Sequence, residues 1–303
     1  MNQTISIRAP EEFGMKSEAL CIPCVIRQCQ RVAAMVSNDA ELLIKVTKNA
    51  LTRIPNLSLT EPPSLFTSRV LLSAYETLGV KDPFAVVKRQ QTQLGKKVAE
   101  KLRSKIDKSA DPLHSAIFYA TLGNVIDSGP QENFDLQEVL NRTNFNHDDY
   151  KLFKEKLGSA TTILYILDNA GEIYFDKLLV EKLLAWEIIL AVKSGPILND
   201  VTISEITEAE LDRLAKIVKT GSRFLGINFA ECSEEFQEAY TQADIVLAKG
   251  HANFESLVQG PRDAFFMLVA KCPVVANKLT ELTGKKIKVG DTVFYYSPAE
   301  EEI

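Results

Sequence analysis

The sequence predicts an α/β protein, in which an all-helical region of residues 1–158 precedes an α/β core of residues 159–303. Two observations support this division. From residue 161 onward, short apolar runs alternate with helical patterns, which is typical of a parallel sheet covered by helices on both faces. Before residue 158, the apolar residues recur only at helical spacing. No internal repeat and no low-complexity segment interrupts either part.

Composition excludes several classes of protein. The chain has 303 residues, of which 46% are hydrophobic and 25% charged, as in an ordinary globular protein. A net charge of −5 argues against a nucleic-acid partner, which requires a basic surface. No apolar run approaches the roughly 20 residues that span a membrane, and residues 1–14 lack the apolar segment of a signal peptide. Five cysteines, an odd number, fit a reducing compartment, so we expect a cytoplasmic protein.

The N-terminal region is predicted to be a series of helices. Gly79 follows one of them at the position where a C-terminal cap is expected. The long segment 83–105 is basic on its outer face, which we interpret as a solvated surface. The predicted helices cover residues 20–36, 39–51, 64–78, 83–105 and 112–126, with shorter helices within 133–157.

Cys21 and Cys24 form a C-x-x-C pair at the start of the first predicted helix, and Cys29 lies on the apolar face of that helix. A structural zinc site requires four ligands, and the sequence contains no second pair. A thioredoxin-like redox motif would follow a strand, which is absent here. We favour small residues used in packing, with metal or redox chemistry and a place in a substrate site as alternatives.

The C-terminal half alternates strands and helices. Its first strand is a short apolar run that leads directly into Asp168 and Asn169, as expected of a buried parallel strand. The predicted strands are 161–167, 187–192, 217–220, 244–248, 273–276 and 289–296, and the predicted helices are 173–184, 204–217, 236–242 and 254–257.

Three polar loops follow three of these strands. They are 168–172 (Asp-Asn-Ala-Gly-Glu), 193–200 (Lys-Ser-Gly-Pro-Ile-Leu-Asn-Asp) and 248–255 (Ala-Lys-Gly-His-Ala-Asn-Phe-Glu). Because the carboxyl ends of parallel strands face one crevice, we expect these loops to converge. Each loop taken singly is a common turn, and Asp168 and Asn169 could simply cap a helix. Their joint placement favours a binding site.

The residues in these loops suit a divalent cation and a phosphate. The carboxylates of Asp168 and Asp200 and the amide of Asn169 supply oxygen ligands of the kind that Mg²⁺ and Mn²⁺ prefer. Lys249 and the backbone amides at a helix N-terminus would stabilise a phosphate. Such an ion could polarise a phosphoryl oxygen and supply an activated water.

Other polar residues are weaker candidates. Asn124 and Asp127 lie three residues apart on an otherwise apolar segment, and they either end a helix or form a wall of the site. His251 lies within the third loop and could contact a substrate. The sequence contains no P-loop, no G-x-S-x-G and no G-x-G-x-x-G motif.

The three loops resemble those of the damage-control phosphatase family, metal-dependent phosphatases long catalogued as a domain of unknown function. The Cys21–Cys24 pair with Gln28, and residues 123–127, are similar to its prokaryotic, cysteine-bearing branch. The resemblance covers nearly the whole chain and implies a three-layer α/β/α Rossmann-like core. It also implies hydrolysis of small phosphorylated metabolites, including sugar phosphates and damaged or side-product compounds, with Mn²⁺, Co²⁺, Ni²⁺ or Mg²⁺ as the cofactor.

The resemblance also assigns roles to residues. Asp168, Asn169 and Asp200 would be the metal ligands, with Asp168 and Asp200 acting in catalysis. The candidates for contact with the substrate or its phosphate are Lys249, Gly250, His251, Ala252, Asn253 and Lys271, together with Glu172, Asn124 and Asp127.

Two other functions remain open at this stage. One is methyl transfer from S-adenosylmethionine to a carboxyl group, against which the missing glycine-rich turn argues. The other is binding of a phosphorylated metabolite without turnover. The sequence carries no clear signal for oligomeric state, and oxygen ligands alone do not identify the native metal.

Overall fold

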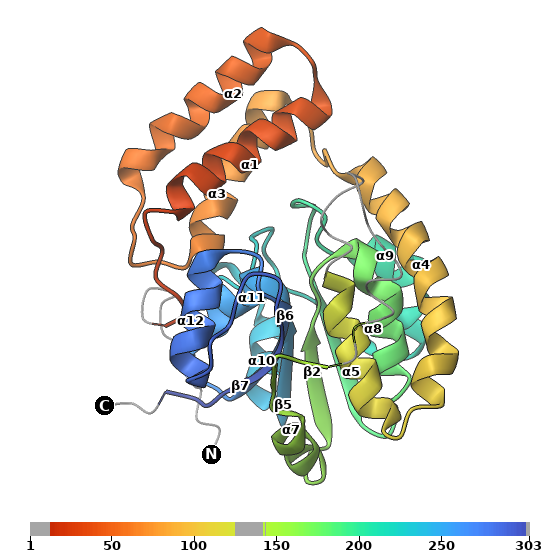
Figure 1. Ribbon diagram of the computed structural model, residues 1–303. Coiled ribbons are helices and arrows are strands. Elements are labelled where there is room, and N and C mark those ends of the chain that lie inside the picture. Colours follow the sequence, from red (N-terminus) through yellow and green to blue (C-terminus); the bar gives the residue numbers. More distant parts are fainter. Residues whose placement is uncertain (1–12, 125–141, 143, 301–303) are drawn as a thin grey trace.

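A seven-stranded sheet forms the centre of the protein (Figure 1). The computed structural model describes residues 13–124, 142 and 144–300. The strand order is β1-β7-β6-β5-β2-β3-β4, and neighbouring strands are parallel except β6 and β7, which are antiparallel. The strands are β1 (His147–Asp148), β2 (Thr162–Ile166), β3 (Glu187–Val192), β4 (Lys216–Lys219), β5 (Ile245–Lys249), β6 (Ala264–Val269) and β7 (Thr292–Ser297).

Helices cover both faces of the sheet, which confirms the predicted three-layer α/β/α class (Figure 1). One face carries α4 (Ala85–Asp107), α5 (Pro112–Leu122), α8 (Ile173–Val180) and α9 (Ile203–Glu208). The other carries α10 (Glu234–Gln242), α11 (Gly250–Leu257) and α12 (Pro273–Thr283). The short helix α7 (Tyr150–Leu157) leads into β2.

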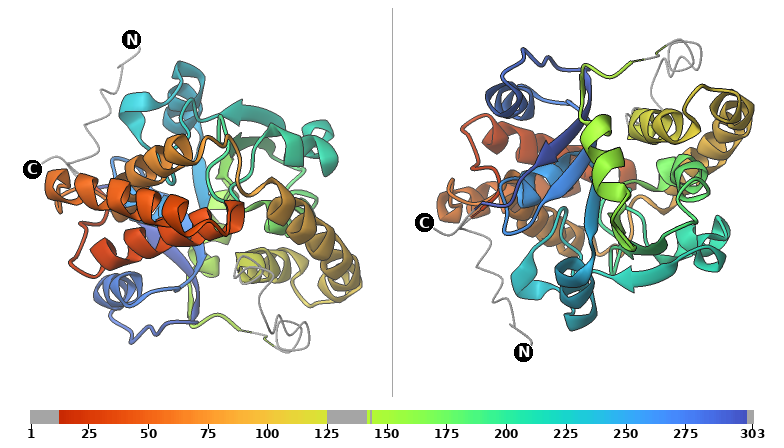
Figure 2. Two further views of the ribbon diagram at one scale, coloured as in Figure 1. Left: turned by 90° about the horizontal axis from the view of Figure 1, so that it is seen from above. Right: turned by 90° about the horizontal axis from the view of Figure 1, so that it is seen from below.

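The first three helices form a separate layer, which we call the helical cap: α1 (Cys21–Val36), α2 (Ala40–Arg53) and α3 (Pro63–Leu78). They pack around apolar side chains of their own, including Val25, Val46 and Phe66. The cap lies across the end of the sheet opposite α7 (Figures 1 and 2). Because β2 runs away from α7, its carboxyl end faces the cap.

The helices of the cap begin and end at the residues that the sequence indicates. Asp39 caps α2 by accepting a hydrogen bond from the backbone N–H of Glu41 at 2.9 Å. Gly79 ends α3 with a φ of +66°, a left-handed conformation that glycine adopts without the steric penalty of a side chain. The predictions for these helices are confirmed within a few residues.

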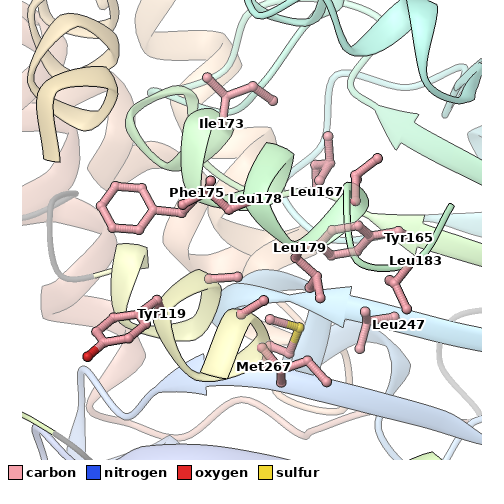
Figure 3. Close-up of a cluster of buried hydrophobic side chains, with 14 of the residues drawn as sticks. Tyr119, Tyr165, Leu167, Ile173, Phe175, Leu178, Leu179, Leu183, Leu247 and Met267 are labelled. Carbon is pink, nitrogen blue, oxygen red and sulfur yellow. The ribbon is translucent and has the colours of Figure 1, made fainter. Parts of the chain in front are cut away.

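A large apolar cluster joins the sheet to α5 and α8 (Figure 3). Tyr165, Leu247 and Met267 extend from the strands and meet Phe175 and Leu179 of α8. Each such buried side chain contributes about 1.5–3 kcal/mol relative to an exposed one. Packing of this kind stabilises α8, which has only eight residues and would be unstable alone.

The predicted strand at 273–276 is wrong. These residues begin helix α12, with Cys272 at the N-cap and Pro273 in the first turn, where its missing N–H leaves no hydrogen bond unmade. The neighbouring strand is instead β6, which the sequence analysis missed. Four apolar residues in a row fit either structure, and the helix is distinguished only by its length up to the cap at Gly284.

The N-terminal region is also not entirely helical. His147 and Asp148 pair with β7 as a two-residue edge strand, too short to produce an alternating pattern. Helices α4 and α5 pack on α8 as part of the three-layer core, whereas α1–α3 form the cap. The domain boundary at residue 158 stays a prediction. Of the short helices expected within 133–157, α7 occupies the end, and 133–141 and 143 lie outside the described residues.

None of the described helices is both long enough and apolar enough to cross a membrane.

Gly95 of α4 packs against backbone and leaves no room for a side chain. A Cβ atom at this position would lie 2.1 Å from the backbone oxygen of Gly171, in the short 3₁₀ turn Ala170–Glu172. We expect Gly95→Ala to lower the free energy of unfolding by about 1–3 kcal/mol, because backbone cannot yield as a side chain can. Urea denaturation measures the change.

The exposed residue Gln93 on the same helix provides the control. Gln93→Ala should change the free energy of unfolding by no more than about 0.5 kcal/mol. Equal stability of the two variants would contradict the close packing of α4 on the turn.

Candidate active site

Backbone pairing joins the loop after β2 to the loop after β3. The backbone N–H of Val201 donates to the carbonyl of Asp168 at 2.8 Å, and that of Ala170 donates to Asn199, also at 2.8 Å. Asn169 and Asp200 form an antiparallel bridge. The structure thus brings together Asp168, Asn169 and Asp200, the three residues expected to hold a metal ion.

Two amide groups fix the carboxylate of Asp168. The Nδ2 atoms of Asn124 and Asn169 each donate to Asp168 Oδ2 at 2.7 Å. The same two nitrogens donate to Glu172 Oε1, at 2.8 Å from Asn124 and 2.6 Å from Asn169. All four residues are buried. Asn124, which follows α5, therefore belongs to the site, and its partner Asp127 lies outside the described residues.

The third loop approaches Asp168 through Gly250. This glycine has a φ of +81°, and a Cβ atom there would lie 1.9 Å from Asp168 Oδ2. Only a residue without a side chain permits this contact. Gly250 is also the first residue of α11, so the N-terminus of that helix, where unpaired backbone N–H groups favour anions, lies beside the carboxylate.

Lys249 is buried completely, with its ammonium group between two carboxylates. Its Nζ atom lies 2.5 Å from Glu172 Oε2 and 2.6 Å from Asp176 Oδ1. Burial opposes the charged form, but the two carboxylates outweigh it and hold the pKa of Lys249 above its usual value. Direct contact between Lys249 and a substrate phosphate stays a prediction.

The other residues expected near the substrate have different roles in the structure. Asn253 donates through Nδ2 to the carbonyls of Leu167 at 3.1 Å and Lys249 at 2.7 Å, which ties α11 to the end of β2. His251 accepts a hydrogen bond at Nε2 from the backbone N–H of Lys271 at 2.7 Å. Lys271 therefore lies beside the third loop although it precedes a helix and not the expected strand. Ala252 and His251 are half-buried.

Three further residues of this region were not among the predicted site residues. Lys193 directly follows β3 and lies with Nζ 3.9 Å from Asp200 Oδ2. Its burial lowers its pKa against the raising effect of Asp200 and Asp168. Asp176 and Tyr165 bind each other beneath Lys249. A lysine directly after an apolar strand was a usable signal for Lys193, whereas Asp176 and Tyr165 have the spacing of ordinary helix and strand residues.

The donor set fits a divalent cation. Asp168 and Asp200 bring two carboxylates to an amide oxygen donor from Asn169, and such ligands suit hard ions. The Oδ1 atom of Asn124 is buried and accepts no hydrogen bond from the described residues, which leaves a further oxygen beside Asp168. Within the described ranges no group of three or more His, Cys, Asp and Glu side chains is arranged for a metal. The set proposed here contains only two such residues because its third member is an amide.

The cysteines do not form a disulfide in the structure. Cys29 packs in the cap, and its burial raises its pKa to about 12. Cys21 is half-buried with a pKa also raised by burial, and Cys24 is exposed.

Comparison with known proteins identifies the family. The family model of the damage-control phosphatase ARMT1-like domain matches residues 18–287 of the sequence. The chain belongs to this family. The predicted resemblance to damage-control phosphatases, and with it the prediction of a phosphatase, is confirmed.

Several relatives are similar over nearly their whole length. A damage-control phosphatase of Pyrococcus horikoshii is 34% identical, over 88% of this chain and 94% of that protein. A damage-control phosphatase of Archaeoglobus fulgidus is 29% identical, over 92% of this chain and 98% of that protein. The crystal structure of a DUF89 family protein from Pyrococcus horikoshii matches with a TM-score of 0.82 and 33% identity, covering 92% of this chain and 98% of that chain.

Contact between Gly250 and Asp168 can be tested by adding a methyl group at Gly250. Gly250→Ala introduces both left-handed backbone strain and a collision with the Asp168 carboxylate. Gly284→Ala is the matched control, because Gly284 has a φ of +65° and nothing within 4 Å of the added Cβ. The strain alone costs about 1–2 kcal/mol at either position.

We expect Gly250→Ala to lower the free energy of unfolding by at least about 1 kcal/mol more than Gly284→Ala, because overpacking adds to the strain. Thermal or urea denaturation of the two variants gives the comparison. Equal losses in both would argue against close contact between the third loop and Asp168.

Proposed function

We propose that this protein is a metal-dependent phosphomonoester hydrolase that acts on small phosphorylated metabolites. The observation that carries the proposal is the backbone pairing that joins Asp168 and Asn169 to Asp200 beside the N-terminus of α11. Cation ligands and an anion-binding helix end thus adjoin each other. The names of the Pyrococcus and Archaeoglobus relatives support the same reaction class.

Asp168, Asn169 and Asp200 would hold one divalent ion, with Mn²⁺, Co²⁺, Ni²⁺ and Mg²⁺ as the candidates. When bound, such an ion polarises a phosphoryl oxygen and provides an activated water. The amides of Asn124 and Asn169 keep the Asp168 carboxylate oriented, which reduces the reorganisation needed during reaction.

The N-terminus of α11 would bind the substrate phosphate. Gly250, His251 and Ala252 form its first turn, and the backbone N–H groups at the start of a helix carry partial positive charge. Lys271 would add the positive charge of its side chain. Its backbone lies next to this helix end, because its N–H donates to the His251 ring. This arrangement binds the phosphate without requiring the buried Lys249 to move.

Asp168 and Asp200 would orient the attacking water. Asp200 lies beside Lys193, whose Nζ atom is 3.9 Å from Asp200 Oδ2. A covalent aspartyl-phosphate route is less favoured, because position 170, two residues after Asp168, holds alanine and not a second aspartate to serve as an acid. Leaving-group recognition would fall to the helical cap, which faces the same edge of the sheet.

The test is release of phosphate from sugar phosphates, nucleotides and phosphopantetheine compounds. The protein is treated with EDTA, and each of the four candidate metals is then added back. We expect release only with added metal, and a loss of at least about 100-fold in Asp168→Ala, because that variant lacks a ligand. Asp212→Ala, at an exposed position in the 3₁₀ turn Leu211–Arg213, is the control and should retain activity.

Three outcomes would contradict the proposal or part of it. Binding of metal and phosphate esters without turnover would favour a non-catalytic binding protein. Saturable binding of S-adenosylmethionine without phosphate release would favour methyl transfer. Metal-dependent activity retained by a folded Asp168→Ala variant would remove Asp168 from the catalytic machinery.

A further inference from the structure

A chain of buried polar contacts begins beneath the site. Tyr165 of β2 donates its hydroxyl hydrogen to Asp176 Oδ1 at 2.6 Å. Lys249 donates to the same oxygen at 2.6 Å, and its ammonium also lies 2.5 Å from Glu172 Oε2. All four residues are 0% exposed. The ammonium group of Lys249 therefore joins α8 to the turn before it, and β2 is connected to it through Asp176.

The chain continues to Asp168 without interruption. The other oxygen of Glu172, Oε1, accepts from the amides of Asn124 and Asn169. Those two amides donate in turn to Asp168 Oδ2. Asp176 is thus connected to the proposed metal ligand by one ion pair, between Lys249 and Glu172, and by hydrogen bonds on either side of it.

The apolar surroundings make this series of polar contacts sensitive to the loss of any one polar group. The ring of Tyr165 lies among Leu167, Leu179, Leu183 and Leu247 (Figure 3). In such an apolar environment each electrostatic contact is stronger than in water, and no solvent replaces a missing donor. The partners must instead shift toward one another.

The charges give these shifts a direction. One ammonium group, on Lys249, is shared by the carboxylates of Glu172 and Asp176. Replacing Asp176 by a neutral residue would leave the ammonium paired with Glu172 alone. Removing the Tyr165 hydroxyl would leave Lys249 as the donor to Asp176 Oδ1 and strengthen its pairing with Asp176 at the expense of Glu172. Either change would shift Glu172 and, through it, the two amides that orient Asp168.

We propose that Asp176 and Tyr165 are positioning residues of the metal site, acting through Lys249 and Glu172 on the orientation of Asp168. The inference rests on the proposed function, because it assumes that Asp168 is a metal ligand. Residues that orient metal ligands in this way typically change metal affinity or activity by 10–100-fold when they are replaced.

The experiment compares Asp176→Asn and Tyr165→Phe with the wild-type protein and with Tyr240→Phe. Tyr240 is the matched control: it is a buried tyrosine on the opposite face of the sheet, and its hydroxyl has no partner among the described residues. Mn²⁺ affinity is measured by calorimetry, folding by thermal denaturation, and phosphate release as a function of Mn²⁺ concentration.

We expect Mn²⁺ to bind about 10–100-fold more weakly to Asp176→Asn and Tyr165→Phe, and unchanged to Tyr240→Phe. Excess Mn²⁺ should restore part of the lost turnover, which a purely structural defect would not allow. If Asp176→Asn does not fold, Tyr165→Phe decides, since it removes a single hydroxyl group.

Wild-type Mn²⁺ affinity in both folded variants would overturn this inference and leave the metal site intact. Absence of Mn²⁺ binding by the wild-type protein would overturn the metal site itself, and this inference with it. The two failures are therefore distinguishable.

Discussion

The hydrogen bonds that hold the Asp168 carboxylate depend on every layer of the protein. One amide donor, Asn124, follows α5, and the other, Asn169, lies in the turn after β2. Gly250 closes the third side from the end of β5. These segments meet because α5 and α8 pack on one face of the sheet, against side chains of β2 and β5. Apolar packing therefore sets the position of a polar site whose own members could not assemble alone.

The helical cap is coupled to the same site through the second loop. The backbone N–H of Leu198 donates to the Tyr75 hydroxyl of α3 at 2.9 Å. Leu198 has a φ of +43°, a left-handed conformation that costs a residue with a side chain about 1–3 kcal/mol. Surrounding contacts maintain this strain, with Asp200 two residues further on. The loop that carries a proposed metal ligand is thus tied to the cap by a hydrogen bond that Tyr75 accepts.

The interior of the proposed site contains charged groups where an apolar core would contain none. A fully buried lysine is costly to desolvate, and the cost is offset only when good partners surround it. Lys249 has two carboxylates within 2.6 Å, and Glu172 connects it to both amides. Such a network contributes less to stability than an apolar core of equal volume would. Its benefit lies in fixed orientation near Asp168.

The sequence by itself determined the α/β class, most helices, and the three loops that contain Asp168, Asp200 and Gly250, because apolar periodicity and turn residues are local properties. It could not decide between strand and helix at 273–276, where four apolar residues fit both, and it missed β6. Only the tertiary structure joined Asn124 to Asp168 across 44 positions, and Lys249 to Asp176 across 73. Those contacts depend on how α5 and α8 pack against the sheet, and local sequence carries no record of such distant pairings.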